Sequence, residues 1–365
     1  MRRGTIIVIL FIVIAAAVVG VSFFLRSQPP LEFTVTVSPL AGAWLRDAAA
    51  SFNASNPTIN GTQAIRVAVQ PQDEAQIALG ESAAWTRENH PAGWIPAAAV
   101  TVDFARSRGL PFETLHESVA QTPLVWGGFG DIVADVTNDG QETFDWPAVN
   151  EAVAAGPVRL AFRSPSATID GFAVLLSGAA ALTENAVITR DSLRSPAARA
   201  WLETTLLAVP NTTTLGASAA GAMAARGPTA GGLALLPESE WLTNLRGQLV
   251  NGSTPVQLAY PAYTVQFTFP CTAWDDPSVT DPAVASRADA VKAFCNYLLT
   301  PAQQANAARF GLRPADGVLS EDNAALFTAA ATYGAQIELP PMAAVQAPNR
   351  SDAQLLALSA SQISP

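Results

Sequence analysis

The chain has 365 residues, of which 49% are hydrophobic and 14% are charged. A chain of this size and composition can bury a large core, so it is not a disordered polyelectrolyte, and we expect it to form two lobes or domains. The formal net charge is -10 and Lys292 is the only lysine, so the clustered cations that a nucleic-acid surface needs are missing. We therefore expect no nucleic-acid partner.

The N-terminus carries a long apolar stretch. Residues 4–25 contain no charged side chain, and two arginines precede them. As a helix, Thr5 to Leu25 would span roughly 32 Å, enough to cross the hydrocarbon core of a membrane with the arginines in the cytoplasm. A cleaved signal peptide is the alternative, but its apolar region is usually shorter, and no A-x-A site ends this one. We expect residues 1–30 to form an uncleaved anchor in the cytoplasmic membrane and a linker.

After the linker, predicted strands and helices alternate along the chain. The segment LEFTVTV at 31–37 has the composition of a strand, and it is followed by a helix in which Trp44, Leu45, Ala48 and Phe52 share one face. Further strands are expected at IRVAVQ, LVWGGFG, VRLAF and GLALL. Such alternation predicts parallel sheets covered by helices, with ligands bound beyond the carboxyl ends of the strands.

The stretch FRSPSATIDGF, residues 162–172, lies at such a strand end. It combines the end of a strand, a turn rich in hydroxyl groups and the first residues of a helix. Free N–H groups at a helix start can hold a ligand, but a Ser or Thr cap can also satisfy them. Thr168 is therefore a candidate for either a ligand contact or a plain helix cap.

The chain contains two cysteines, Cys271 and Cys295, with no CxxC or histidine pattern around them, so we expect no metal site there. Export to an oxidising compartment favours a disulfide between them, and two buried free thiols are the alternative. Cys295 shares a helix face with Val291, Phe294 and Leu298, which places it at the edge of the core.

Two helix boundaries can be read from local sequence. Thr300, Pro301 and Gln303 have the spacing of a capping box with proline at the first helical position, and Gly311 is placed to end the same helix. The segment MAARGP, residues 223–228, indicates another helix that ends at a glycine and a proline.

Motifs for catalysis or metal binding are weak. The chain has no G-x-S-x-G and no H-E-x-x-H, and His90 and His116 are its only histidines. The stretch DVTNDGQE resembles the start of a calcium loop with Gly140 at the turn, but Trp146 occupies the position of the bidentate glutamate. An ordinary polar turn is the preferred interpretation there. We expect a protein that is not an enzyme and has no cofactor.

Taken in order, seven segments resemble the extracellular solute-binding proteins of bacterial ABC transporters, in the two-lobed class that includes the molybdate- and iron-type binding proteins. The resemblance runs from Leu31 to about Asp316. Its segments are VSPLAGAWLRDAAASFN, HPAGWIPAAAV, QTPLVW, FDWPAV, FRSPSATIDGFAVLL, MAARGPTAGGLALLPES and VKAFCNYLLTPAQQANAARFGLRPAD.

The resemblance implies an α/β fold of the type II periplasmic-binding-protein kind. Two lobes are joined by two crossing strands, near QTPLV and again near Pro255 to Tyr263, and the ligand is held in the cleft between the lobes. The implied divisions are 31–124 for the first part of lobe I, 125–254 for lobe II, and 255–365 for a return to lobe I with C-terminal helices.

In such proteins, the loop after the first strand, the W-x-P loop and the helix starts of the second lobe face the cleft. Carried over by position, the resemblance implies the ligand-binding residues Ser38, Trp94, Thr168, Asp170, Gly171, Thr214 and Glu238.

Asp170 departs from the pattern, because relatives often have Ser or Thr at that position. A carboxylate at a helix start can serve the helix dipole. If Asp170 faces the cleft instead, it would repel an oxyanion and favour a cationic or hydroxyl-bearing ligand.

The expected function is capture of a small molecule or ion on the extracytoplasmic side of the membrane, for an ABC transporter permease or a membrane sensor. The alternative is a non-catalytic scaffold that keeps the fold without a small-molecule ligand. Polar groups that converge on the cleft would favour capture, and a cleft filled by apolar side chains would favour the scaffold.

Overall fold

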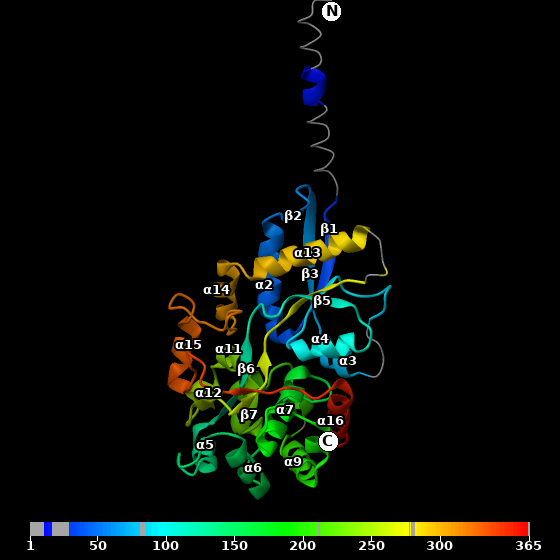
Figure 1. The fold of residues 1–365 in the computed structure, drawn as a ribbon. Helices are drawn as coiled ribbons and strands as arrows, with labels where there is room; N and C mark the ends of the chain where they lie inside the picture. Colours follow the sequence, from blue (N-terminus) through cyan, green and yellow to red (C-terminus); the bar gives the residue numbers. More distant parts are fainter. Residues whose placement is uncertain are drawn as a thin grey trace, which may run out of the picture.

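In the computed structural model, two β-sheets packed against helices form two lobes, lobe I and lobe II, which lie one above the other in Figure 1. The structure describes residues 11–16, 29–80, 85–210, 212–276, 278 and 282–363.

Lobe I is built on a six-stranded sheet in the order β2-β3-β1-β4-β11-β5. Its strands are β1 (Leu31–Val37), β2 (Thr58–Ile59), β3 (Gln63–Pro71), β4 (Gly93–Ile95), β5 (Phe112–His116) and β11 (Cys271–Trp274). β1 pairs in parallel with β3 and β4, which confirms the predicted arrangement for this part of the sheet. β11 runs antiparallel to β4 and β5, so a segment from the last third of the chain completes lobe I.

The central strand of lobe II is β6. The strands of this lobe are β6 (Thr122–Phe129), β7 (Leu233–Pro237), β8 (Val256–Ala259) and β10 (Gln266–Phe267). β7 and β8 both pair antiparallel with β6, so the predicted parallel arrangement is wrong for this sheet. The two strands run in opposite directions. β6 runs from the junction into lobe II, and β7 runs back toward the junction and ends beside Leu124. The predicted strand VRLAF is reduced to one parallel bridge between Leu160 and Leu233.

Two neighbouring segments connect the lobes. The first residues of β6, Thr122 and Pro123, pair antiparallel with β10. Beside this pair, the hydroxyl of Thr264 donates to the carbonyl of Leu124 at 3.0 Å and accepts its N–H at 3.1 Å. The predicted second crossing was the stretch from Pro255 to Tyr263. In the structure the crossing comes after this stretch, because β8 still belongs to the sheet of lobe II.

Helices cover both sheets (Figure 1). They are α2 (Gly42–Ala54), α3 (Ala75–Leu79), α4 (Ala99–Arg106), α5 (Gly130–Val136), α6 (Trp146–Ala155), α7 (Ile169–Thr183), α8 (Arg190–Arg194), α9 (Pro196–Leu207), α10 (Ala219–Arg226), α11 (Glu238–Asn244), α12 (Gln248–Asn251), α13 (Pro282–Leu298), α14 (Pro301–Arg309), α15 (Ala325–Ala330) and α16 (Arg350–Ile363). The 3₁₀ turns are η1 (Pro39–Ala41), η2 (Thr212–Leu215), η3 (Gly227–Thr229) and η4 (Ala331–Tyr333), and two short strands are β9 (Tyr263–Thr264) and β12 (Ala343–Ala344).

The apolar faces predicted for α2 and α13 are confirmed. Trp44, Leu45, Ala48 and Phe52 of α2 are buried, as are Val291, Phe294, Cys295 and Leu298 of α13. The two faces meet where the rings of Phe52 and Phe294 pack edge to face with centroids 5.3 Å apart. Burial of these side chains fixes α2 and α13 on lobe I.

The local boundary signals were partly right. α14 begins at Pro301 and Gly311 follows its end with φ +74°, but the predicted capping box is wrong. The hydroxyl of Thr300 donates to the carbonyl of Tyr297 at 2.7 Å, and the Gln303 amide donates to the Tyr297 hydroxyl at 3.0 Å. Both side chains therefore serve the end of α13 and not the start of α14.

The other predicted helix end, in MAARGP, is confirmed. α10 ends at Arg226, followed by Gly227 with φ +64° and then Pro228. The predicted disulfide is also present: Cys271 and Cys295 join β11 to α13, with Cα atoms 6.1 Å apart. It closes a loop within lobe I.

The expected membrane span, Thr5 to Leu25, lies largely outside the described residues. Within it, residues 11–16 are helical and expose the apolar side chains of Phe11, Ile12, Val13 and Ile14. Searched over its described residues, the chain has no helix with the length and hydropathy needed to cross a membrane.

The C-terminal segment contacts both lobes. β12 pairs in parallel with β9, and α16 packs against α9 of lobe II and α3 of lobe I (Figure 1). The guanidinium of Arg350 donates to the carbonyls of Ala78 and Gly80 at 2.8 Å each. On the lobe II side, Arg190 pairs with Asp352 at 2.7 Å. The C-terminal segment thus fastens the lobes together in addition to the two crossing segments.

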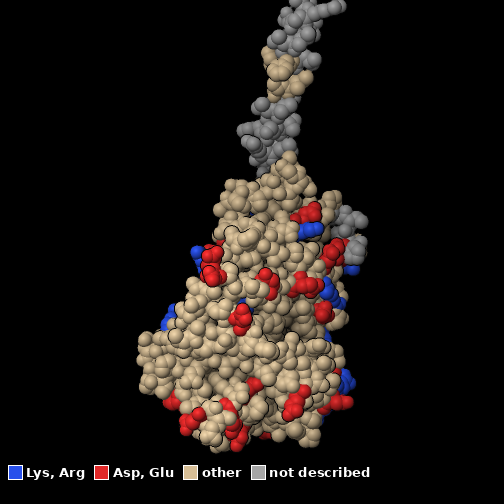
Figure 2. Space-filling model, turned by 60° about the vertical axis from the view of Figure 1, so that its left-hand side comes forward, with Lys and Arg blue, Asp and Glu red and all other residues tan. Residues whose placement is uncertain are grey.

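Charged side chains are spread over the face in Figure 2, where acidic groups outnumber basic ones and no basic cluster forms. This pattern agrees with the net charge of -10. This face gives a polyanion no concentrated cationic patch to bind.

Candidate functional site

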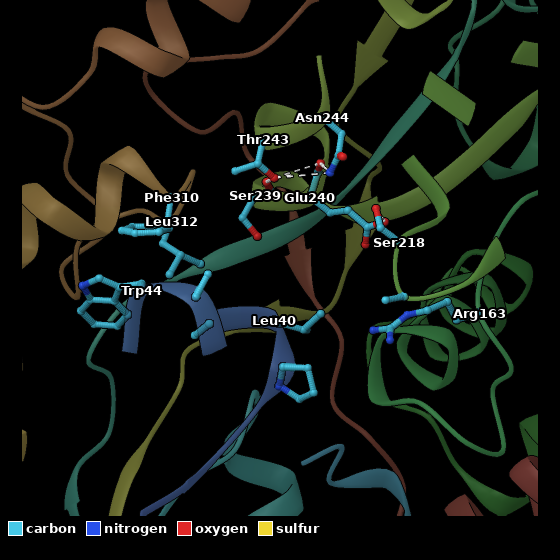
Figure 3. Close-up of a pocket in the computed structure, with 14 residues that line it drawn as sticks. Leu40, Trp44, Arg163, Ser218, Ser239, Glu240, Thr243, Asn244, Phe310 and Leu312 are labelled. Atoms are coloured by element: carbon cyan, nitrogen blue, oxygen red, sulfur yellow. Dashed lines mark hydrogen bonds between the residues drawn. The ribbon is translucent and has the colours of Figure 1, made fainter. Parts of the chain in front are cut away.

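A cavity of about 340 Å³ lies between the lobes (Figure 3). Lobe I contributes the turn after β1 and the start of α2, lobe II contributes the starts of α10 and α11, and the chain after α14 closes one side. The lining residues are Pro39, Leu40, Ala41, Ala43, Trp44, Arg163, Ala217, Ser218, Ser239, Glu240, Thr243, Asn244, Phe310 and Leu312.

The two walls of the cavity differ in chemistry. On the lobe I side, the lining side chains are apolar except for the indole N–H of Trp44, which has no hydrogen-bond partner among the described residues. Leu40 and Trp44 are the largest of them, from η1 and α2. On the lobe II side, polar and charged side chains gather, among them Arg163, Ser218 and Glu240 (Figure 3). The cavity is therefore amphipathic, with one apolar wall and one polar wall.

Arg163 is held in place on the polar wall by Asp170. Its Nε donates to Oδ2 of Asp170 at 2.9 Å and its Nη2 donates to Oδ1 at 2.6 Å. The side chains of Arg163 and Asp170 are 12% and 2% exposed, so this two-contact pair is nearly buried. Burial lowers the pKa of Arg163, but the Asp170 carboxylate outweighs it and the net direction is upward. Arg163 stays charged, and its guanidinium points toward the cavity (Figure 3).

Glu240 supplies the carboxylate of the polar wall. Its Oε1 accepts hydrogen bonds from the Ser218 hydroxyl at 2.8 Å and from the N–H of Ala220 at 3.0 Å, at the start of α10. Burial raises the pKa of Glu240, and the nearby Asp170 raises it further. Among the described residues, Oε2 of Glu240 has no hydrogen-bond partner, and it is not fully buried. One oxygen of this carboxylate is therefore available to a ligand.

Beside the cavity, Asp73 of lobe I contacts the start of α7 in lobe II. Its Oδ1 accepts the N–H of Ile169 at 3.1 Å and the N–H of Ala75 at 3.0 Å. Close by, the amide of Gln76 donates to the carbonyl of Ser166 at 3.0 Å. Burial raises the pKa of Asp73 to about 6. These hydrogen bonds hold the two lobes together next to the cavity.

Solved structures of known proteins have a similar fold. A chitin oligosaccharide binding protein has 14% identity and a TM-score of 0.58, over 92% of this chain and 94% of that one. A periplasmic thiamin binding protein has 11% identity and a TM-score of 0.57, over 93% and 98%. A Streptococcus pneumoniae solute-binding protein in complex with the blood group A-trisaccharide has 14% identity and a TM-score of 0.55, over 92% and 95%.

The chain has the fold of the two-lobed solute-binding proteins. No protein-family model matches the chain, and no curated protein matches it. At these sequence identities the similarity concerns the fold alone. In this fold, the cavity lies in the cleft between the two lobes.

Three of the sequence-predicted site residues lie at the start of α7. Thr168 caps the helix: its hydroxyl accepts the N–H of Gly171 at 3.3 Å and donates to the carbonyl of Ser164 at 3.1 Å. A Cβ on Gly171 would come within 2.2 Å of the Arg163 carbonyl oxygen, so glycine allows the turn to close on the helix. Asp170 holds Arg163. None of the three lines the cavity itself.

Ser38 and Trp94 lie in the interior of lobe I. Ser38 precedes the cavity-lining turn, but its side chain is buried and its hydroxyl interacts with the carboxyl of Glu74, whose pKa it lowers. Trp94 packs in an aromatic cluster, with ring centroids 5.3 Å from Trp85 and 5.4 Å from Phe112. Neither side chain lines the cavity.

Thr214 and Glu238 also lie away from the cavity. Thr214 is exposed in η2, where its carbonyl accepts a hydrogen bond from Arg226 at 2.8 Å. Glu238 is completely buried and pairs with Arg313, and the Tyr260 hydroxyl donates to it. Burial, followed by the charge of Glu238, raises the pKa of Tyr260.

The polar residues that do line the cavity were not predicted. Arg163 lies inside the FRSPSATIDGF segment and lines the cavity. A single arginine at a strand end forms no sequence motif that would indicate a ligand contact. Glu240 follows Glu238 by two positions in the same helix, and residues spaced in this way point to different sides. One sequence signal could have distinguished the two glutamates. On a helical wheel of α11, the apolar positions Trp241 and Leu242 mark the buried face, and the two glutamates lie at different angles to it.

Proposed function

We propose that this protein captures a small solute outside the cell between its two lobes and delivers it to an ABC transporter permease or to a membrane sensor. The observation that supports this most is the amphipathic cavity in the cleft, with Arg163 and Glu240 on one wall. Known proteins of the same fold are named as binding proteins, which supports binding without catalysis.

A scaffold that has lost its ligand is less well supported. In a scaffold, the cleft has no reason to keep polar groups facing an open space, because buried polar atoms without partners cost free energy. In this cleft Arg163 and Glu240 line one unfilled cavity, and among the described residues Nη1 of Arg163 and Oε2 of Glu240 have no hydrogen-bond partner. The cleft thus meets the condition that favours capture.

Capture predicts that the full-length protein, purified without denaturation, carries a small molecule. Native mass spectrometry should show an added mass that is lost on unfolding. In an Ala217→Trp variant, a large ring would occupy the cavity from its exposed rim, so the added mass should disappear. Ala285→Trp, on the exposed side of α13, is the matched control and should keep it. A native protein with no added mass, and with no binding in titrations of amino acids, sugars and anions, would contradict capture.

We further propose that Thr5 to Leu25 anchors the protein in the cytoplasmic membrane, with the lobes on the extracytoplasmic side. The uncharged stretch after two arginines supports this, as do the exposed apolar side chains of residues 11–14. The protein should stay in the membrane fraction after alkaline washing, and N-terminal sequencing should begin within the first few residues. A mature chain that starts after Val21 would show cleavage of a signal peptide instead.

A further inference from the structure

The polar wall of the cavity carries one cation and one carboxylate that do not pair with each other. Arg163 pairs with Asp170, and Glu240 bonds to Ser218 and Ala220. Within the described part of the chain, Nη1 of Arg163 and Oε2 of Glu240 have no hydrogen-bond partner. The wall therefore offers a free donor on a cation and a free acceptor on a carboxylate, side by side in one cavity (Figure 3).

The arginine is oriented before a ligand arrives. Two hydrogen bonds to Asp170 fix the plane of its guanidinium, so binding a carboxylate through Nη1 would order little further. A ligand that is only an anion is nevertheless a poor match. Asp170, Asp73 and Glu240 all lie close enough to Arg163 to raise its pKa. The one cation of the polar wall is therefore surrounded by three carboxyl groups. A negative group on the ligand needs a positive group beside it, within reach of Glu240.

The opposite wall excludes a ligand that is polar all round. Pro39, Leu40 and Leu312 bring no hydrogen-bonding side chain to the cavity, and Phe310 adds an aromatic ring. Hydroxyl groups of a sugar or polyol that faced this wall would lose water without gaining a partner. An apolar group placed there would be stabilised by roughly 25 cal/mol for each Å² it buries.

The size of the cavity sets the last condition. At about 340 Å³ it lies near the lower end of small-molecule sites, which run from roughly 300 to 1,000 Å³. One compact molecule would fill it, and most of an oligosaccharide or of a peptide of several residues would lie outside it.

We propose that the solute is a zwitterionic amino acid with an apolar side chain, its carboxylate bound by Arg163, its ammonium bound by Glu240, and its side chain packed against Leu40 and Phe310. This inference rests on the proposed capture function and specifies the ligand for the same cleft. Both charges of the ligand are matched on one wall, and its apolar body meets the other.

Calorimetric titration of the full-length protein, dialysed free of small molecules, tests the proposal. The probes are L-leucine, L-isoleucine, L-valine and L-phenylalanine, with N-acetyl-L-leucine and L-leucinamide as analogues that lack one charge each. We expect L-leucine to bind, whichever of the other three amino acids also bind. Each analogue should bind at least tenfold more weakly than L-leucine, because a charge-assisted hydrogen bond in the cleft is then lost.

Variants assign the two contacts. Glu240→Gln keeps an oxygen for Ser218 and Ala220 but loses the charge, so it should weaken amino-acid binding about tenfold or more and leave N-acetyl-L-leucine unaffected. Glu142→Gln removes a carboxylate from an exposed turn and should change nothing. A loss of equal size for both probes would show that Glu240 acts on the cleft in general and would overturn its assigned role.

Ribitol, maltose and sulfate complete the test. If one of these binds and the four amino acids do not, the proposed ligand class is wrong while capture stands. If no probe binds and the native protein carries no small molecule, capture itself is wrong. The two failures are therefore distinguishable.

Discussion

An Arg313→Met variant is expected to lose about 3–5 kcal/mol of the free energy of unfolding, because it leaves a buried carboxylate without its cation. Arg313 and Glu238 are both completely buried, and the guanidinium donates to the carboxylate at 2.7 and 2.8 Å. Methionine fills similar space but cannot compensate the charge of Glu238. Chemical denaturation followed by tryptophan fluorescence measures the loss.

The damage should extend beyond one ion pair, since Arg313 connects distant segments. Its Nη1 donates to the carbonyl of Ile337 at 2.8 Å and its Nη2 donates to the carbonyl of Gln336 at 2.6 Å. The Tyr260 hydroxyl accepts the N–H of Gln336 at 2.9 Å and donates to Glu238. The start of α11, the segment after β8 and the chain after η4 thus meet at one buried charge pair.

A double variant separates the charge effect from the loss of packing. Combining Arg313→Met with Glu238→Gln removes both charges, so part of the lost stability should return. If the two single losses simply add in the double variant, then the lost stability comes from packing and not from an uncompensated charge.

The sequence predicted the elements whose identity depends on local periodicity. The faces of α2 and α13 follow from apolar residues spaced three and four apart, and that spacing is a property of the helix itself. The direction of β7 relative to β6 has no such local signal, because a buried strand has the same composition in parallel and antiparallel sheets. The fold class was therefore more predictable than the strand pairing of lobe II.

The capping box failed for a related reason. Thr300 and Gln303 have the right spacing, but Tyr297, in the last turn of α13, offers both of them a closer partner. A local motif predicts what two side chains can do together, and it carries no information on a third group that competes for them.

The candidate site shows the same limit. The FRSPSATIDGF segment does lie beside the cleft, yet Thr168 uses its hydroxyl to cap α7, and Arg163 faces the cavity. The role of Arg163 depends on Asp170 and on the apolar wall of lobe I. The residues of that wall are distant from Arg163 in the sequence. Buried pairs such as Glu238 with Arg313, 75 positions apart, likewise have no sequence pattern.

Stability should fall as the pH rises from about 4.5 to 8, because Glu74 is buried in lobe I at the start of α3. Its Oε1 accepts the N–H of Ala97 at 2.6 Å, and the buried hydroxyl of Ser38 also interacts with the carboxyl and lowers its pKa. Burial, together with the neighbouring Asp73, raises the pKa of Glu74 from 4.5 to about 8.

The sign follows from proton binding. Between about pH 4.5 and 8 the folded protein keeps the Glu74 proton and the unfolded chain has lost it, so stability falls as the pH rises through this range. The full loss is about 5 kcal/mol. Asp73, whose pKa is raised from 3.8 to about 6, adds a loss of the same sign at lower pH.

A Glu74→Gln variant should remove most of this dependence. Glutamine keeps an oxygen for the N–H of Ala97 and has no charge to bury, so the variant should match the native protein near pH 5 and exceed its stability by several kcal/mol at pH 9. Urea unfolding at pH 5, 7 and 9 gives the three values. Glu142→Gln, which removes an exposed charge, should follow the native curve. If the Glu74→Gln curve runs parallel to that of the native protein, then Glu74 is already ionised in the folded state and the burial argument fails.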